Sequence, residues 1–386
     1  MSKSRINSLL VTILVLLLCQ TVSAECLDCH TGVAANWEKS TMSDDLKCND
    51  CHGSQHDSAE NANLVQRATP AVCANCHAEQ VDQFASGKHA LGFDALEVVP
   101  NYKAIPAVAG ESGCEGCHKV GYNWPDGSKG SCDSCHPRHT FSVAEALEPA
   151  ACGNCHSGDH PQYDLYENSK HGKFYGISSD AERYPTCQSC HMPNGDHQAI
   201  TAWGFIGYRP AFEGEDPEER AVLEKVKQAI TEIGPAKAPG VYRTSYAEWA
   251  TEREKMIDTC TECHSRSFAE RRLVLGDQMV IESSKVFVKL YDLANQMHEE
   301  GLIDEMTKNS MMREALAHRF SAYMGTFHGA HEAAWDEGYL ALSDDLIHAR
   351  DTMIEQKKLS MIKDKMGKQF LLSTGAAILA IFGLSN

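Results

Sequence analysis

Cys187-Gln188-Ser189-Cys190-His191 is one of eight copies of a pentapeptide, C-x-x-C-H, that decide the organisation of this chain. The other copies are Cys26-Leu27-Asp28-Cys29-His30, Cys48-Asn49-Asp50-Cys51-His52, Cys73-Ala74-Asn75-Cys76-His77, Cys114-Glu115-Gly116-Cys117-His118, Cys132-Asp133-Ser134-Cys135-His136, Cys152-Gly153-Asn154-Cys155-His156 and Cys260-Thr261-Glu262-Cys263-His264. C-x-x-C-H is the attachment signature of c-type haem. Both thiols form thioethers with the porphyrin vinyl groups, and the histidine binds iron.

A single pair of thiols could instead hold zinc, form a redox dithiol or belong to disulfides. Sixteen of the seventeen cysteines fall into the pattern, and a histidine follows the second cysteine every time. Neither zinc nor disulfide chemistry requires that histidine. The sequence therefore predicts eight covalent haem c groups, whose irons are bound by His30, His52, His77, His118, His136, His156, His191 and His264.

The first residues have the pattern of a secretory signal peptide, residues 1–24. Lys3 and Arg5 precede the apolar stretch 9–18, and Val22-Ser23-Ala24 offers small residues for cleavage. An uncleaved anchor and a lipoprotein site at Cys19 are the alternatives. Because haem is attached to such motifs outside the bacterial inner membrane, we expect the protein in the periplasm.

The charge of the chain restricts its partners. The formal net charge is −18 over 386 residues. This charge argues against nucleic acid or anionic lipid as a partner, because both would be repelled. A basic electron-transfer protein could dock on such a surface, although solubility explains the acidity equally well. We expect a cytochrome, or a quinone-linked cytochrome, as the redox partner.

The C-terminal tail, residues 367–386, contains an apolar stretch from Phe370 to Leu384. Its fifteen residues are fewer than the about 17–25 of a transmembrane helix. Lysines precede it, which on the exported side runs against the usual charge bias. We expect a tail that attaches the protein to the inner membrane; an oligomer-packing helix and a disordered end are the alternatives.

The chain between these ends changes character near residue 265. Seven motifs lie within residues 26–191, among Gly, Pro, Asn and Asp, a composition typical of short helices and turns. We expect an octahaem-binding domain over 25–265 that includes a helix near 217–232. After it, apolar residues recur at helical spacing and predict a long-helix region over 266–366. The expected helices cover 268–300, 305–346 and 347–366, with breaks at Gly325 and Gly329.

Eleven histidines lie outside the motifs, and an electron-transfer haem needs a second axial ligand. His56, His139 and His197 follow motif histidines too closely to reach the opposite face of the same haem, so we expect each to bind a neighbouring iron. The predicted second ligands are His56, His89, His139, His171, His197 and His328. His318 and His331 stay open, whereas His298 and His348 are expected in solvent.

A catalytic haem needs one axial position open to substrate. Asp159-His160-Pro161 follows the sixth motif closely. A carboxylate and an imidazole side by side near an open iron could relay protons. The alternative is that His160 is an axial ligand and Asp159 a capping residue.

Several stretches resemble the hydroxylamine oxidoreductase (HAO) family of octahaem cytochromes c. They are the eight motifs, Gly158-Asp159-His160-Pro161-Gln162-Tyr163, Asn168-Ser169-Lys170-His171-Gly172, Pro185–Pro193 and Gly195-Asp196-His197. The resemblance covers roughly residues 25–350. It implies a mainly α, HAO-like multihaem cytochrome c fold with a long-helix C-terminal part.

The resemblance also implies a chemistry. The fourth motif, with Cys114, Cys117 and His118, would carry the substrate-binding haem, with Asp159 and His160 on its distal side. The other seven haems would have two histidine ligands and relay electrons. The family forms homotrimers, and its oxidising members cross-link a tyrosine from a neighbouring subunit to the catalytic haem. Tyr323 and Tyr339 lie in the corresponding region, where helix packing is the expected role.

The sequence thus favours an enzyme that converts hydroxylamine, nitrite or nitric oxide, with a preference for the reductive direction. A non-catalytic electron conduit with every iron doubly ligated is the first alternative. A sulfur-oxyanion reductase is the second.

Overall fold

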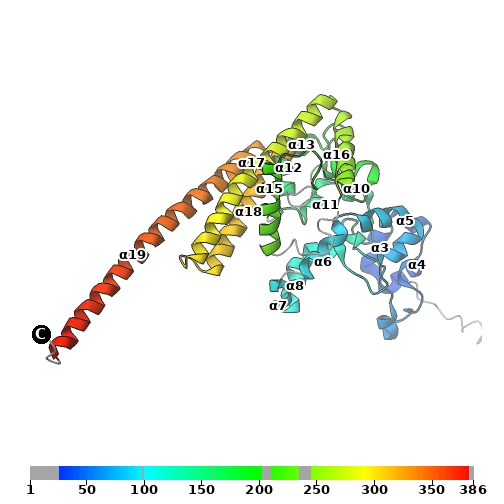
Figure 1. The fold of residues 1–386 in the computed structure, drawn as a ribbon. Helices are drawn as coiled ribbons and strands as arrows, with labels where there is room; N and C mark the ends of the chain where they lie inside the picture. The colour runs from blue at the N-terminus through cyan, green and yellow to red at the C-terminus, as the bar shows by residue number, and fades with distance from the viewer. Residues whose placement is uncertain (1–25, 98–99, 159, 202–209, 234–244, 382–386) are drawn as a thin grey trace, which may run out of the picture. The chain divides into compact units, whose positions relative to one another are not determined.

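The computed structural model describes residues 26–97, 100–158, 160–201, 210–233 and 245–381 (Figure 1). These residues form helices and turns without a strand, and an isolated antiparallel bridge joins Asn123 to Lys129. The predicted mainly α fold is confirmed. The predicted signal peptide, residues 1–24, lies outside the described residues.

The chain divides into two compact units, each made of two segments. Unit 1 comprises residues 1–81 and 131–146, and unit 2 comprises residues 82–130 and 147–386. The boundary expected between residues 265 and 266 divides the sequence by motif content and stays a prediction.

Unit 1 holds four of the motifs on short elements. Helix α5 (Pro70–Ser86), kinked at His77, begins in this unit and ends in unit 2. The other elements of unit 1 are α2 (Cys26–Cys29), α3 (Thr31–Trp37), η1 (Thr41–Asp44), α4 (Cys48–His52), η2 (Ala59–Leu64), η5 (Cys132–Ser134) and α10 (Val143–Ala146).

Unit 2 combines short elements around the other four motifs with long C-terminal helices. The short ones are η3 (His89–Leu91), α6 (Gly92–Glu97), α7 (Pro100–Ala104), α8 (Ala107–Ser112), α9 (Cys114–His118), η4 (Lys119–Gly121), α11 (Pro149–Gly153), α12 (Gln162–Asn168), α13 (Lys170–Ser178), α14 (Cys187–His191) and η6 (Pro193–Gly195). The longer ones are α15 (Pro217–Ile233), α16 (Tyr246–Thr261), α17 (Arg266–Glu299), α18 (Glu305–His328), the π-helix η9 (Ala333–Leu340) and α19 (Ala341–Ile381).

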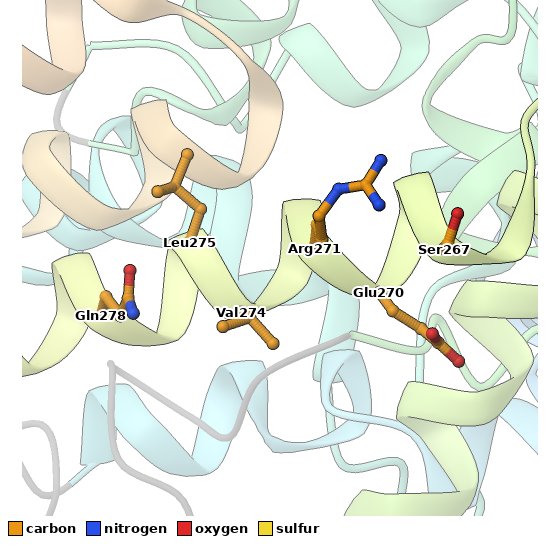
Figure 2. A pocket seen from close by; sticks show the side chains of 6 residues that line it. All are labelled: Ser267, Glu270, Arg271, Val274, Leu275 and Gln278. Atoms are coloured by element: carbon orange, nitrogen blue, oxygen red, sulfur yellow. The ribbon is translucent and has the colours of Figure 1, made fainter.

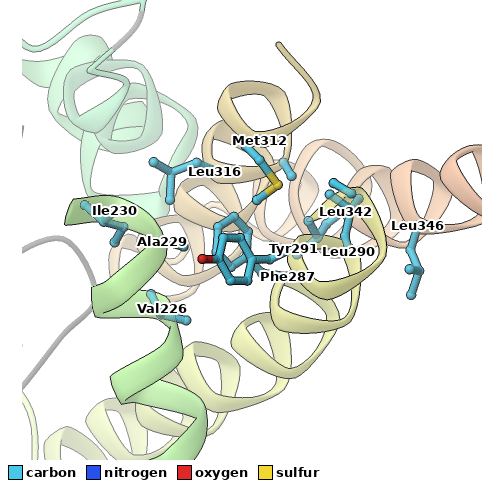
Figure 3. Packing of buried hydrophobic residues seen from close by; sticks show 12 residues of the cluster. Val226, Ala229, Ile230, Phe287, Leu290, Tyr291, Met312, Leu316, Leu342 and Leu346 are labelled. Atoms are coloured by element: carbon cyan, nitrogen blue, oxygen red, sulfur yellow. The ribbon is translucent and has the colours of Figure 1, made fainter. Parts of the chain in front are cut away.

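The core of unit 2 lies where four helices meet (Figure 3). Phe287 and Leu290 of α17 are almost fully buried, and they pack with Val226 of α15, Met312 of α18 and Leu342 of α19. Burying side chains of this size contributes about 1.5–3 kcal/mol each. The predicted apolar spacing in 268–300 is therefore confirmed.

The predicted helix 305–346 is wrong as a single helix. Helix α18 ends at His328, because Gly329 adopts φ 77 and closes the helix in the left-handed conformation. Of the two expected breaks, the one at Gly329 occurs. Gly325 stays inside α18, where a Cβ would come within 2.8 Å of the Ala334 nitrogen. Glycine there allows η9 to approach α18 closely.

Helix α19 is longer than the predicted 347–366. It runs to Ile381 and continues beyond α17 and α18 (orange to red in Figure 1). Over the described residues, no helix combines the length and apolar character needed to cross a membrane. Membrane attachment through residues 367–386 stays a prediction.

Candidate haem-binding site

Each attachment motif lies on a helical turn, either alone or as part of a longer helix such as α5 or α16. In four of them the histidine N–H donates to the carbonyl of the first cysteine at 2.9–3.0 Å, as in an α-helix, namely His30, His136, His156 and His264. The residue at the third position of a motif can also cap the start of its turn. In the second motif, Asp50 Oδ2 accepts a hydrogen bond from Lys47 N at 2.7 Å. The turn brings the first cysteine and the histidine, four residues apart, to the same side.

Six motif histidines face a second imidazole. The distances between ring centroids are 5.9 Å for His30–His56, 6.1 Å for His52–His139, 6.0 Å for His156–His89, 6.2 Å for His118–His160, 6.2 Å for His264–His171 and 6.3 Å for His191–His328.

This spacing fits a metal between each pair. Imidazole nitrogens bind transition metals at about 2.0–2.1 Å, so two opposed nitrogens lie about 4 Å apart and the ring centroids about 6 Å apart. Haem iron takes its axial ligands along one such line. The residues present therefore fit haem iron with two histidine ligands.

The pairs also agree with the expectation that a histidine shortly after one motif lies opposite the histidine of a different motif. In unit 1, His56 faces His30 rather than the neighbouring His52. His139, three residues after His136, faces His52 instead. Iron ligation itself stays a prediction for these histidines and, equally, for His77, His136 and His197.

Hydrogen bonds fix the orientation of several of these rings. The Nδ1 atom bonds to a backbone carbonyl in His118 (Gly92 O, 2.8 Å), His191 (Ile200 O, 2.7 Å) and His328 (Met324 O, 2.8 Å). Such a bond assigns the proton to Nδ1 and leaves Nε2 as the metal-binding atom. These partners are main-chain atoms, so no sequence motif could have indicated them.

Burial keeps several of the paired rings neutral. It lowers the pKa of His89 and of His328 to about 4. It also lowers the pKa of His139, His171 and His191. Neutral imidazole is the form that binds metal, so the surroundings favour ligation.

His160 lies beside two motif histidines. Its ring centroid is 6.2 Å from that of His118 and 6.5 Å from that of His156. The structure thus brings the proposed relay histidine to the fourth motif, as the resemblance implies. Asp159, the other predicted catalytic residue, lies outside the described residues.

The remaining histidines lie on the C-terminal helices. His318 Nδ1 is 2.8 Å from Asp345 Oδ2, and His298 Nε2 is 3.2 Å from Glu305 Oε2. His331 and His348 are exposed. Within the described part of the chain, no motif histidine faces any of these four rings at the spacing above.

The two tyrosines of the C-terminal region have different surroundings. Tyr323 is buried among Leu223, Val280 and Ile281, and burial raises its pKa to about 12. Tyr339 stacks on the exposed ring of Trp335, with centroids 5.8 Å apart. Helix packing accounts for Tyr323, as expected.

Thiols of different motifs lie next to one another. Cys26 lies close to Cys48, Cys73 close to Cys132, and Cys152 close to Cys187, near enough for the paired thiols to influence each other's pKa. Each cysteine is an attachment point of a porphyrin edge. The contacts therefore bring attachment points of different haems together in both units.

A shallow hollow on α17 is unrelated to this chemistry. Figure 2 shows that its lining comes from one helix, and the residues are Ser267, Glu270, Arg271, Val274, Leu275 and Gln278. It contains no cysteine or histidine, so we assign it no role in haem binding.

Comparison with known proteins gives the family. The family described as "Seven times multi-haem cytochrome CxxCH" matches residues 22–311, a range that contains all eight motifs. A protein of Kuenenia stuttgartiensis named "Probable nitrite reductase-hydroxylamine oxidoreductase fusion protein" is 29% identical in an alignment over 300 residues that covers 70% of this chain and 33% of that protein. The chain thus spans about a third of the length of this relative.

Solved structures share the fold. A "reducing HAO-like protein complex" of Kuenenia stuttgartiensis matches with a TM-score of 0.68 and 22% identity, over 88% of this chain and 86% of that chain. A "Hypothetical multiheme protein" matches with a TM-score of 0.67 and 20% identity, over 87% of this chain and 96% of that chain. The HAO-like fold is confirmed, and the chain belongs to the multi-haem cytochromes with CxxCH motifs, which bind haem c covalently.

Proposed function

We propose that this protein is a periplasmic octahaem oxidoreductase of the hydroxylamine oxidoreductase type, which converts hydroxylamine, nitrite or nitric oxide. The eight motifs and the name of the Kuenenia relative support this proposal. Haem supplies a redox-active iron with an axial position for a substrate nitrogen. Eight haems, one of them open to substrate, let one subunit hold the electrons of a multi-electron reaction.

The position of His160 carries the proposal. Its loop is closed by two hydrogen bonds, from Tyr163 N to His156 O at 2.8 Å and from Gly158 N to Asp164 Oδ2 at 2.9 Å. The loop holds the imidazole opposite His118, the histidine of the fourth motif. There His160 can give or take a proton, assisted by Asp159.

The spin state of the oxidised protein tests this proposal. One high-spin haem among eight is expected. His160→Ala should reduce turnover by about 10²–10⁴-fold, the usual contribution of a general acid–base group, while all eight haems stay attached. His348→Ala is the matched control on an exposed histidine. Unchanged turnover in His160→Ala would remove this residue from the mechanism.

The second candidate is an electron conduit without an open iron. It is favoured by one distance, because the 6.2 Å between His118 and His160 falls within the 5.9–6.3 Å of the other pairs. His160 would then be an axial ligand. All eight haems would be low-spin in the wild type, and His160→Ala would create a high-spin haem.

We propose the reductive direction for the enzyme. Tyr323 is buried in a cluster of its own subunit, and neither it nor Tyr339 is identified as a cross-linking tyrosine. Steady-state assays with nitrite or hydroxylamine and a reduced donor should therefore give faster turnover than assays with hydroxylamine and an electron acceptor. Faster oxidation would reverse the assignment.

A homotrimer is the proposed assembly. On α19 and the residue before it, Leu340, Ile347, Ile354 and Met361 repeat every seven residues and are 39–70% exposed. A seven-residue apolar repeat is typical of helices that pack against other helices along their length. Light scattering should give three times the subunit mass, and Ile354→Glu should lower it.

The electron route and the location complete the proposal. The neighbouring thiols of different motifs would bring their haems close enough to exchange electrons, and a cytochrome would supply or accept them. Residues 1–24 would direct export, and residues 367–386 would attach the protein to the inner membrane. Fractionation of cells with and without residues 367–386 tests the attachment.

A further inference from the structure

A chain of hydrogen bonds leads from His191 to an ion pair that the proposed chemistry does not use. His191 Nδ1 donates to Ile200 O at 2.7 Å. The N–H of the same peptide group belongs to Thr201, and it donates to Glu252 Oε2 at 3.3 Å. Lys88 Nζ lies 3.2 Å from the same oxygen. One peptide group therefore separates a carboxylate from the imidazole.

The ion pair is held in a largely buried position. The side chains of Lys88 and Glu252 are 23% and 13% exposed, and Ile200 is fully buried. Lys88 also donates to Thr201 Oγ1 at 3.3 Å. Next to it, a Cβ on Gly87 would come within 2.6 Å of Gln198 O, so glycine permits this close approach of the two segments. Charges so placed are screened less than surface pairs.

These charges act on the imidazole in opposite senses. A carboxylate that accepts from a peptide N–H polarises the peptide, which strengthens its carbonyl as an acceptor. A stronger bond at Nδ1 makes the imidazole more basic toward a metal. The ammonium of Lys88 weakens this effect, because it offsets the charge of Glu252.

We propose that the Lys88–Glu252 pair sets the reduction potential of the haem attached to Cys187 and Cys190. Glu252 lowers this potential by stabilising ferric iron through His191, and Lys88 raises it by offsetting that charge. The two residues position and tune a ligand and do not touch substrate. The inference rests on the proposed ligation of this iron by His191 and His328.

Two isosteric substitutions test the inference in the purified octahaem protein. Glu252→Gln keeps an acceptor for Thr201 but removes the charge, so the potential of one haem should rise. Lys88→Met keeps the length of the side chain and leaves Glu252 without its counter-charge, so the same potential should fall. The double variant should return toward the wild-type value. Spectroelectrochemical titration followed at the low-spin haem bands measures all three.

Control variants distinguish an effect of the charges on the reduction potential from a disturbance of the structure. Lys225→Met and Asp292→Asn remove the charges of an exposed ion pair, 2.6 Å between Nζ and Oδ2, and should shift no potential. Lys88→Arg should restore the wild-type value. Shifts of the same sign in Glu252→Gln and Lys88→Met, or none, would overturn the inference.

A ligand variant separates this inference from the proposed function. His328→Ala should add one high-spin haem to the number present in the wild type and remove from the titration the wave that the charge variants move. If the number of high-spin haems stays as in the wild type, the proposed ligation is wrong, whatever the charge variants do. If one haem turns high-spin but the charge variants move no wave, the tuning by Lys88 and Glu252 is wrong and the ligation stands.

Discussion

Unit 1 and the C-terminal helices of unit 2 differ in what their side chains pack against. In the described part of unit 1, Ser40 and Pro70 are the only buried residues, although four attachment motifs lie there. Where α15, α17, α18 and α19 meet, twelve apolar residues form one buried cluster. The helices bury their own apolar surface, whereas unit 1 offers short turns and paired imidazoles. We propose that porphyrins supply most of the apolar core of unit 1.

Loss of a haem from unit 1 should have the largest effect on the difference in stability between unit 1 and the C-terminal helices. Cys73→Ala with Cys76→Ala removes both thioether positions of the third motif. We expect amide protection in residues 26–81 and 131–146 to collapse, because few side-chain contacts remain to hold these segments. Protection in α17 and α18 should persist. Hydrogen exchange measures both regions in one sample, and equal loss in the two would break the comparison.

A cavity in the helix bundle should destabilise the long helices and leave the haem-binding segments unchanged. Leu290→Ala removes a side chain that is 1% exposed, and we expect a loss of about 2–5 kcal/mol in the free energy of unfolding. Haem bands should be unchanged, because no motif residue belongs to this cluster. Denaturant titration followed by circular dichroism gives the loss. Met306→Ala, at a side chain 75% exposed, is the control and should change stability by less than about 0.5 kcal/mol.

The break between α18 and η9 gives a smaller, purely conformational effect. Gly329→Ala forces a side chain into φ 77 and should cost about 1–2 kcal/mol. Gly367→Ala makes the same chemical change inside α19, where no atom lies within 4 Å of the new Cβ, and should stabilise by about 0.5–1 kcal/mol. Thermal unfolding should therefore shift in opposite directions. Equal shifts would mean that the conformation of Gly329 is not what ends α18.

The smallest effect is expected at the surface of the bundle. Lys225 and Asp292 form an ion pair at 2.6 Å with side chains 46% and 51% exposed. Lys225→Met should cost less than about 1 kcal/mol, and the cost should shrink with added salt. Denaturant titrations at low and high ionic strength check this. A larger, salt-independent loss would show that the bundle depends on charges as well as on apolar packing.

Parts of the site follow from the sequence because they depend on local geometry. The attachment residues are recognisable because two thiols and an imidazole must lie on one short turn. His56 and His139 could be assigned to other motifs, since they follow their own too closely. His328 had no such signal, because 136 residues separate it from the ring of His191 that it faces.

The amino-acid sequence by itself determined the cofactor, the helical class and the periodic apolar faces of the long helices, because each depends on residues within a few positions of one another. Only the tertiary structure decided which imidazoles face each other and which charged residues are linked to His191 by hydrogen bonds. Those features join residues tens to more than a hundred positions apart, and their pairing depends on how the whole chain packs.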